Sequence, residues 1–282
     1  MRSARSRVGK DFNLDERMEA CAAAREADPA SWKGQWRFWT PAGQERRTEP
    51  YRKVVLDLGC GKGEYTVACA LQNPDVLFVG LDIEPICVMR GAERALTEGA
   101  TNVTFVYGDD PDLTELFDAE LDAILMNFPT PFPKKKKAPY RLTYVDRLMT
   151  YRKLLAPGAP VRLRTDSQPL RDFSLTQIEL AGYELLWNSD DVRSLFADEP
   201  WSAYEHKLVA QGATVYGFQA VLGEEPEDIE QTAPLSLVSY LPEDIESLGY
   251  VPHGMQGCVA NMRGRRANRR ARGLSEWVRP IV

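Results

Sequence analysis

The sequence predicts an α/β protein built on a doubly wound, mostly parallel sheet with helices on both faces. Two observations support this prediction. From residue 54 onwards, short apolar runs each end in a polar or small residue, as buried parallel strands do. Between these runs lie segments with apolar residues at helical spacing, and strands that alternate with helices in this way form βαβ units.

The predicted strands and helices follow one another in chain order. The strand candidates are VVLDLG, LFVGLD, VTFVYGD, LDAILMNF, PVRLRTD, YELLWN and TVYGFQAVL. The helix candidates are GEYTVACALQNP, PICVMRGAERALTEG, YVDRLMTYRKLLA and LRDFSLTQIELAGY. Together the strands make a sheet of about seven, which is an ordinary size for an open sheet.

Composition divides the chain into three parts. Residues 1–52 are an N-terminal lead-in with a short helix at ERMEACAAAREA and aromatic residues in GQWRFW that can pack on the main domain. Residues 53–222 form that main domain. Residues 223–282 are a C-terminal extension, in which the acidic linker GEEPEDIEQTAP precedes the arginine-rich segment MRGRRANRRARG. Between the two, LPEDIESLGYVPHGMQG predicts a small helix and a turn.

Bulk composition excludes several classes of protein. The net charge of −6 argues against a protein that coats nucleic acid non-specifically, although a local basic face remains compatible with it. The five cysteines are odd in number and never form a CxxC pair, which indicates reduced thiols rather than disulfides or zinc ligands. Only His206 and His253 offer imidazoles, so we expect no metal. No apolar run reaches membrane-spanning length, and we expect a cytoplasmic protein without a membrane partner.

The segment VVLDLGCGKGEYT places a glycine-rich turn between a buried strand and a helix. Gly59 and Gly61 let the backbone turn sharply and approach a ligand closely. Dinucleotide-binding and methyltransferase folds both use such a loop, and a tight turn without a ligand has the same pattern. The loop alone leaves these alternatives open.

Three acids follow three successive predicted strands. Asp57 stands just before the glycine loop, Asp82 ends the second strand and Asp109 ends the third. The carboxyl ends of parallel strands line the crevice in which open α/β sheets bind ligands. There Asp57 can face an amino group, Asp82 can accept from ribose hydroxyls, and Asp109 can meet an adenine amino group. Together the three acids favour S-adenosylmethionine over NAD as the cofactor.

Several further motifs occur in a recognisable order: WKGQW, LDLGCGKGEY, NPDVLFVGLDIE, NFPTPFPKKKKAPYRLTY, RTDSQPLRDFSL and SAYEHKLVAQGATVY. In these motifs, from residue 30 to residue 222, the chain resembles the bacterial tRNA (guanine-N(7)-)-methyltransferase family. The resemblance implies a Rossmann-like class I methyltransferase fold and S-adenosylmethionine as the methyl donor. It also implies a guanine in the variable loop of tRNA as the acceptor, and therefore tRNA as the partner.

The same resemblance implies which residues form the site. The family's cofactor-binding acids fall on Asp57, Asp82 and Asp109, next to the loop glycines Gly59 and Gly61. Thr130 and Asp166 stand at the positions expected to be catalytic. The family's substrate-binding positions fall on Lys134, Asp166, Ser202, Tyr204 and Glu205.

One loop departs from the family pattern. The family's FPDPWPK reads FPTPFPK here, so Thr130 stands where an aspartate is expected and Phe132 replaces a tryptophan. Ring nitrogen 7 of guanine carries a lone pair and no proton, so its methylation needs alignment and exclusion of water rather than a general base. We therefore expect a slower or retuned enzyme, with Asp166 and Glu205 as the remaining acidic contacts of the base.

Two basic segments are candidates for RNA contacts. Lys134 to Lys137, together with Arg141, form a basic loop that can neutralise phosphates, and a solvated charge run is the alternative. The arginines between residues 263 and 272 either fold on RNA, form a solubilising tail or pair with the acidic linker.

Alternative functions remain open at this point. One is a methyltransferase of the same fold with another RNA or a small molecule as the acceptor, for which Thr130 is the main support. Another is a catalytically weak RNA-binding relative that keeps the fold. A nicotinamide oxidoreductase is disfavoured, because the loop lacks the GxGxxG of dinucleotide-binding folds. The expected assembly is a monomer or a homodimer.

Overall fold

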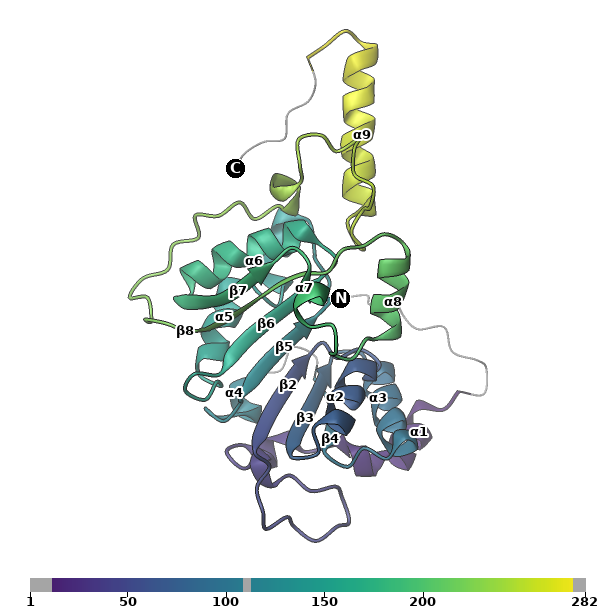
Figure 1. Cartoon of the computed structure of the whole chain (residues 1–282), viewed down its shortest axis with the longest axis vertical. Helices are drawn as coiled ribbons and strands as arrows, with labels where there is room; N and C mark the ends of the chain where they lie inside the picture. The colour runs from purple at the N-terminus through teal and green to yellow at the C-terminus, as the bar shows by residue number, and fades with distance from the viewer. Residues whose placement is uncertain (1–11, 109–112, 276–282) are drawn as a thin grey trace. The chain divides into compact units, whose positions relative to one another are not determined.

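The structure is a computed structural model that describes residues 12–108 and 113–275. It has an α/β fold in which strands and helices alternate along the chain (Figure 1). Eight strands form a mixed, mostly parallel sheet in the order β1-β4-β3-β2-β5-β6-β8-β7. The strands are β1 (Arg25–Glu26), β2 (Lys53–Leu58), β3 (Val76–Asp82), β4 (Val103–Tyr107), β5 (Ala123–Asn127), β6 (Pro160–Thr165), β7 (Tyr183–Ser189) and β8 (Tyr216–Leu222).

Helices connect most of these strands. They are α1 (Leu14–Ala20), α2 (Glu64–Gln72), α3 (Pro85–Glu98), α4 (Leu113–Leu116), α5 (Val145–Arg152), α6 (Gln168–Leu180), α7 (Val192–Leu195), α8 (Ala203–Ala210) and α9 (Gln256–Ala271). The chain forms two compact units. Unit 1 comprises Met1–Asn127, Thr150–Val161 and Asp198–Ala203, and unit 2 comprises Phe128–Met149, Arg162–Ala197 and Tyr204–Val282.

In unit 1, the parallel strands align their carboxyl ends. Asp57 on β2 lies opposite Gly80 on β3, and Asp82 on β3 lies opposite Tyr107 on β4. Nearly continuous burial of β2 and β3 explains their uninterrupted apolar sequences, because a parallel sheet has helices on its faces. The shared register brings the residues that follow these strands to one edge of the sheet.

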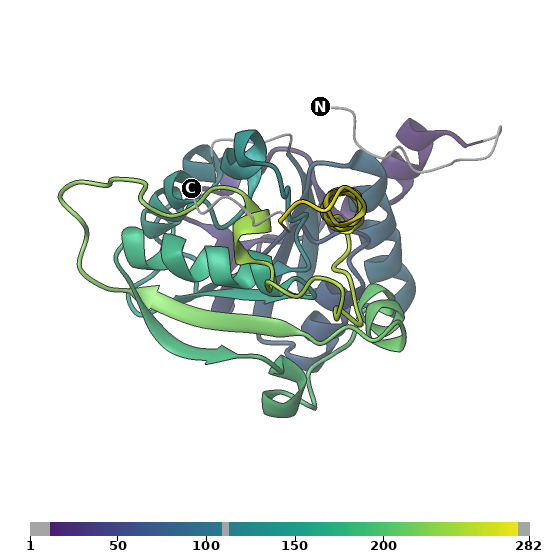
Figure 2. The same cartoon turned by 90° about the horizontal axis from the view of Figure 1, so that it is seen from above.

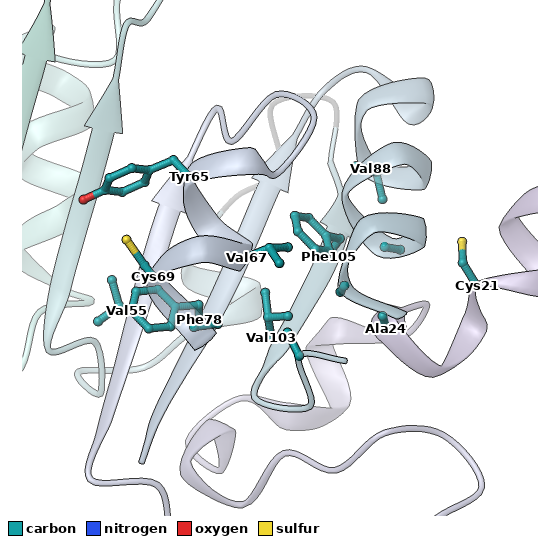
Figure 3. Close-up of a cluster of buried hydrophobic side chains, with 14 of the residues drawn as sticks. Cys21, Ala24, Val55, Tyr65, Val67, Cys69, Phe78, Val88, Val103 and Phe105 are labelled. Carbon is teal, nitrogen blue, oxygen red and sulfur yellow. The ribbon is translucent and has the colours of Figure 1, made fainter. Parts of the chain in front are cut away.

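A phenyl ring fixes the distance between the sheet and its helices in unit 1. Phe105 on β4 is fully buried within the apolar cluster drawn in Figure 3. A Cβ atom added to Gly63, Gly80 or Gly91 would lie within 2.7 Å of this ring. The ring therefore fills the space that these glycines leave, and it holds the end of the glycine loop and α3 against the strands.

In unit 2, the antiparallel pair β7 and β8 carries α6 on one face. The C-terminal extension then runs back over α6 towards α9 (Figure 2). The side chains of Gln231 and Gln177 exchange hydrogen bonds of 2.7 and 3.2 Å along this path. A buried apolar cluster joins α6 to the extension through Leu170, Phe173, Leu237, Leu241, Ile245, Met255, Val259 and Met262.

The seven predicted strands and the four predicted helices between them are confirmed, and the structure adds an eighth strand. β1 comes from the lead-in and pairs with Phe105 and Val106 of β4, although its two residues are too short to show a periodic pattern. The prediction that GQWRFW packs on the main domain is also confirmed. Trp36 is fully buried, stacks on Phe117 at 5.2 Å between ring centroids, and donates its indole N–H to the Leu116 carbonyl at 2.8 Å.

The extension differs from its prediction. Residues 241–255 form turns rather than a small helix, and the arginine-rich segment is the ordered helix α9. Arginine is a good helix former, and Val259, Met262 and Arg266 share one buried face at helical spacing. Arg266 donates to Glu246 at 2.9 Å, so α9 pairs with an acid outside the predicted acidic linker.

Candidate functional site

The glycine loop connects β2 to α2 through left-handed backbone. Gly59, Gly61 and Gly63 have φ values of 78°, 56° and 70°. The amides of Gly59 and Cys60 both donate to the Leu81 carbonyl, at 2.8 and 3.1 Å, which ties the loop to β3. A Cβ atom added to Gly61 would meet no atom within 4 Å. The loop therefore approaches open space, as a loop that receives a ligand must.

Asp82 faces this loop from the end of β3. Its Oδ2 accepts from the Gly61 amide at 2.8 Å, and its Oδ1 accepts from the Glu84 amide at 2.8 Å. Burial raises the pKa of Asp82 even though both backbone bonds favour the charged form. A direct hydrogen bond thus connects Asp82 to the glycine loop, a contact that the sequence did not predict.

Asp57 holds two elements of unit 1 together. Its side chain is fully buried, with Oδ2 accepting from the Thr66 hydroxyl at 2.6 Å and Oδ1 from the Asn127 amide at 3.1 Å. Thr66 lies on α2 and Asn127 ends β5, so the carboxylate links the loop helix to the next strand. Asn127 was absent from the predicted site, although a polar residue at the end of the fourth predicted strand was a usable signal.

The third predicted acid, Asp109, lies outside the described residues. The preceding Gly108 donates its amide to the Asp82 carbonyl at 3.2 Å. Two half-buried thiols at the loop, those of Cys60 and Cys87, have raised pKa values because desolvation and nearby carboxylates disfavour the thiolate. For Cys87 the pKa rises to about 11, so this thiol stays protonated at neutral pH and is a poor nucleophile.

The loop that departs from the family pattern begins unit 2 and is strained. Phe128 and Phe132 have φ values of 50° and 44°, which aromatic residues rarely adopt. Thr130 lies exposed between them. Strain of this kind persists only where surrounding contacts impose it, and it concentrates at functional sites.

Arg141 imposes that conformation. Its guanidinium is buried, donates to the Pro131 and Phe132 carbonyls at 3.0 and 2.8 Å, and lies 4.2 Å from the centroid of the Phe173 ring. Burial lowers the pKa of Arg141 to about 10, and the group remains cationic at neutral pH. The prediction that Arg141 belongs to a phosphate-binding surface is therefore wrong, because its guanidinium is buried and donates to carbonyls of the loop.

The four lysines behave differently from Arg141. Lys134 is the N-cap residue of the 3-10 helix η4 (Lys135–Tyr140), and the other three lysines begin that helix. Lys134, Lys135 and Lys136 are exposed. The three line a shallow hollow together with Pro139 and with Leu235 of the extension. Lys137 instead places its ammonium 4.5 Å from the centroid of the Tyr140 ring. A basic surface is thus present at the predicted place, with three exposed charges.

Asp166 follows β6 directly and is nearly buried. Its Oδ2 accepts two hydrogen bonds from the C-terminal extension, one from the Tyr250 hydroxyl at 2.7 Å and one from the His253 amide at 2.8 Å. Within the part of the chain that the structure describes, Oδ1 of Asp166 receives no hydrogen bond. Nothing in the sequence signalled these contacts, because the donors lie more than eighty positions further along the chain.

Tyr204 begins a small aromatic group in unit 2. Its ring meets Phe128 edge-on and His253 edge-on, each at 5.9 Å between ring centroids. Burial and the nearby Asp166 raise the pKa of Tyr204 to about 12, so its phenol is protonated at neutral pH. Lys134, Asp166 and Tyr204, which the resemblance placed in one site, all lie in unit 2, and the extension contacts the last two.

The other two predicted substrate residues have different surroundings. Glu205 is fully buried, and its carboxylate pairs with Arg164 at 2.6 Å and with Arg193. An acid held in this way is an internal ion pair rather than an exposed contact for a base. Ser202 belongs to unit 1, beside Ala203, whose amide donates to Glu64 at 2.6 Å.

Residues 12–108 and 113–275 contain neither a cluster of metal ligands nor a membrane-spanning helix. No group of three or more histidine, cysteine or acidic side chains there could hold a metal ion. Among those same residues, no helix combines the length and apolarity needed to cross a bilayer.

Similarity to known proteins identifies the family. The family described as "Putative methyltransferase" matches residues 51–218. The chain is 31% identical over 206 residues to the tRNA (guanine-N(7)-)-methyltransferase of Limosilactobacillus fermentum, covering 72% of this chain and 92% of that protein. The chain belongs to the tRNA (guanine-N(7)-)-methyltransferase family. The resemblance carried by the sequence motifs is thereby confirmed.

A second relative agrees with this membership. The enzyme of the same name from Geobacillus kaustophilus is 32% identical over 196 residues, covering 69% of this chain and 87% of that protein. Among solved structures, the 16S rRNA methyltransferase KamB has a TM-score of 0.47 at 16% identity, covering 62% of this chain and 89% of that chain. Residues 223–282 of this methyltransferase-family chain lie beyond the matched family region.

Proposed function

We propose that the chain transfers a methyl group from S-adenosylmethionine to ring nitrogen 7 of a guanine in the tRNA variable loop. Membership of the tRNA (guanine-N(7)-)-methyltransferase family is the observation that carries this proposal. The charges and hydrogen bonds of two groups of residues support it. One group surrounds the glycine loop of unit 1, and the other surrounds Asp166 in unit 2.

The first group fits a methyl donor of this kind. Gly61 presents backbone to open space, the preceding Gly59 has the left-handed backbone that the turn requires, and Asp82 offers a half-buried carboxylate beside the loop. In the proposal, Asp82 accepts hydrogen bonds from the ribose hydroxyls of the donor. The loop backbone contacts its amino-acid part, and Asp109 accepts a hydrogen bond from the adenine amino group. Asp57 acts by holding α2 to β5, because both of its oxygens already accept bonds. Once bound, the donor supplies an electrophilic methyl carbon on a sulfonium.

The second group suits a guanine acceptor. Nitrogen 7 brings its own lone pair, so no residue of the chain has to remove a proton before the new carbon–nitrogen bond forms. The chain has to orient the base, exclude water and offset the positive charge that the ring gains. Oδ1 of Asp166 can accept from the amide edge of guanine, and the protonated phenol of Tyr204 can donate. Lys134 and its neighbours can hold the RNA backbone in register.

Thr130 determines the expected rate. An aspartate at this position would offset the developing charge, and its absence costs about 1–3 kcal/mol, or one to two powers of ten in rate. Thr130 is exposed, so an aspartate fits there without burying a charge. We expect the natural chain to be slow and Thr130→Asp to be faster.

Methyl-transfer assays on unmodified tRNA test this proposal. The natural chain, Thr130→Asp and the matched control Thr232→Asp are compared under the same conditions. Thr232 is also exposed but lies in the C-terminal extension, so the same added charge should leave the rate unchanged there. Absence of methylation by the natural chain contradicts the proposal, and activity in Thr130→Asp alone would mean that the natural chain has lost the reaction. A methylated nucleoside other than 7-methylguanosine favours the alternative, in which the loop change has altered the acceptor.

A further inference from the structure

We infer that Tyr250 and His253 of the C-terminal extension are positioning residues for the acceptor base, acting through Asp166 and Tyr204. This inference rests on the proposed function. The extension lies beyond the region that the family match covers, so these contacts are a feature of this chain rather than of the matched region.

The hydrogen bonds to Asp166 are one-sided. The Tyr250 hydroxyl and the His253 amide both donate to Oδ2, at 2.7 and 2.8 Å. Two donors on one oxygen fix the rotation of the carboxylate, and the other oxygen then points in a defined direction. Because Oδ1 accepts nothing from the described residues, it is the oxygen left for a ligand. A fixed acceptor loses less entropy on binding than a mobile one.

The same short segment orders Tyr204. The His253 ring meets the Tyr204 ring edge-on, and the Phe128 ring also meets Tyr204 edge-on. Phe128 in turn holds strained backbone next to Thr130. His253 thus touches Asp166 with its backbone and Tyr204 with its ring, and a single turn of the extension contacts two predicted substrate residues.

That turn is firmly anchored. Gly254 has a φ of 83° and passes so close to Pro131 that a Cβ atom would lie 3.0 Å from its ring. The next residue, Met255, is fully buried, and its sulfur accepts from the Ser167 hydroxyl at 3.4 Å. Further along, Arg263 donates to the Ile245 carbonyl at 2.7 Å. The arginines of α9 therefore brace the extension, and the positioning contacts belong to a rigid element.

The protonation state of Tyr250 supports its role as a hydrogen-bond donor to Asp166. Burial and the hydrogen bond to Asp166 raise the pKa of the Tyr250 phenol. The phenol therefore keeps its proton at neutral pH, and it remains a donor to Asp166 throughout the range in which the enzyme would work. The alternative interpretation of the same contact is that the extension covers Asp166 and inhibits the enzyme. The change in kcat/KM of a Tyr250 variant separates the two, because positioning predicts a decrease and inhibition predicts an increase.

Tyr250→Phe tests the inference with Tyr240→Phe as its matched control. Tyr240 lies in the same extension and donates its hydroxyl to the Pro234 carbonyl at 3.0 Å, away from Asp166. We expect Tyr250→Phe to lower kcat/KM for tRNA about tenfold, with donor affinity and Tm matching those of Tyr240→Phe. Equal kcat/KM in the two variants overturns the inference, and a Tyr250→Phe enzyme faster than the natural chain establishes inhibition instead.

A double-mutant cycle with Asp166→Asn separates positioning from general stability. If Tyr250 acts through Asp166, Tyr250→Phe costs nothing further in the Asp166→Asn background. Losses that multiply in the double variant contradict the inference. His253→Ala, which keeps the backbone amide and removes the ring, should lower kcat/KM about threefold to tenfold through Tyr204. The His253→Ala variant also tests the inference if Tyr250→Phe folds poorly. An unaltered kcat/KM in His253→Ala contradicts the inference.

The activity of the natural chain on tRNA distinguishes failure of the inference from failure of the proposed function. If it methylates no tRNA, the proposed function falls and this inference falls with it. If it methylates tRNA and Tyr250→Phe is indistinguishable from Tyr240→Phe, only the inference falls.

Discussion

The backbone amide of Gly61 donates a 2.8 Å hydrogen bond to Oδ2 of Asp82, so the glycine loop and the acid at the end of β3 form one structural unit. The carboxylate holds the loop, and in the proposed function its remaining lone pairs accept hydrogen bonds from the ribose of the donor. The pKa of Asp82 is raised because burial destabilises the ionised carboxylate more than the two backbone hydrogen bonds stabilise it.

Donor binding should therefore depend on pH through Asp82. The proposed contact needs the ionised carboxylate, so the affinity for S-adenosylmethionine should weaken as the pH falls towards the raised pKa of Asp82. The effect on folding has the opposite sign. Because the folded pKa lies above the unfolded one, Asp82 contributes stability at low pH that is lost as the pH rises through its folded pKa. Calorimetry of donor binding at several pH values measures the first effect.

The control for this experiment is Asp75→Asn. Asp75 is exposed and pairs with Arg52 on the surface, so its loss should leave the pH profile of donor binding unchanged. Asp82→Asn should instead flatten the profile. A profile that keeps its slope in Asp82→Asn would assign the titration to another group.

Glu205→Gln should destabilise the fold. The change removes the buried carboxylate that pairs with the buried Arg164 and the half-buried Arg193, which costs about 3–5 kcal/mol in the free energy of unfolding. The control Glu98→Gln removes an exposed pair with Arg94 and should cost no more than about 1 kcal/mol. Urea unfolding measures both. A Glu205→Gln protein of natural stability with impaired tRNA methylation would restore Glu205 as a direct substrate contact.

Gly91→Ala should also destabilise the chain, and Gly264→Ala should not. Both glycines lie inside helices, but a methyl group at Gly91 would strike the Phe105 ring at 2.5 Å, whereas at Gly264 it meets nothing within 4 Å. Overpacking costs about 1–3 kcal/mol, and alanine in an exposed helix gains about 0.5–1 kcal/mol over glycine. Thermal unfolding of the two variants checks the signs. Equal Tm changes would mean that the Phe105 contact does not limit packing in unit 1.

The lysine surface should appear in the salt dependence of tRNA binding. Replacing Lys134, Lys135 and Lys136 with glutamine should make the plot of log affinity against log salt shallower by about 0.7–0.9 per lysine that contacts a phosphate. Lys153→Gln, an exposed lysine in unit 1, serves as the control and should leave the slope unaltered. A triple variant with the natural slope would indicate a solvated charge run.

The sequence was sufficient where function depends on local pattern. The alternation of apolar strands and helices predicted β2 to β8, and it placed Asp82 correctly at the end of its strand, while the cofactor-binding role of Asp82 stays a prediction. The glycine loop was predicted for the same reason. Each of these features is encoded within about 30 neighbouring residues, the length of a βαβ unit.

The sequence did not predict the surroundings of residues whose partners lie far along the chain. Arg141 stands in a basic run yet is buried under the strained loop, and Glu205 stands in a substrate motif yet neutralises two arginines. The donors that Tyr250 and His253 present to Asp166 come from an extension with no periodic signal. In each case the partner lies far along the chain, and residue type alone does not distinguish an exposed charge from a buried one.

Mass spectrometry of nucleosides most directly tests whether this chain methylates nitrogen 7 of guanine. Unmodified tRNA is incubated with the natural chain and S-adenosylmethionine, digested, and analysed for methylated nucleosides. The account predicts 7-methylguanosine that increases with time and is absent without the donor. A chain that binds the donor but yields no methylated nucleoside, or only one methylated elsewhere, would contradict it.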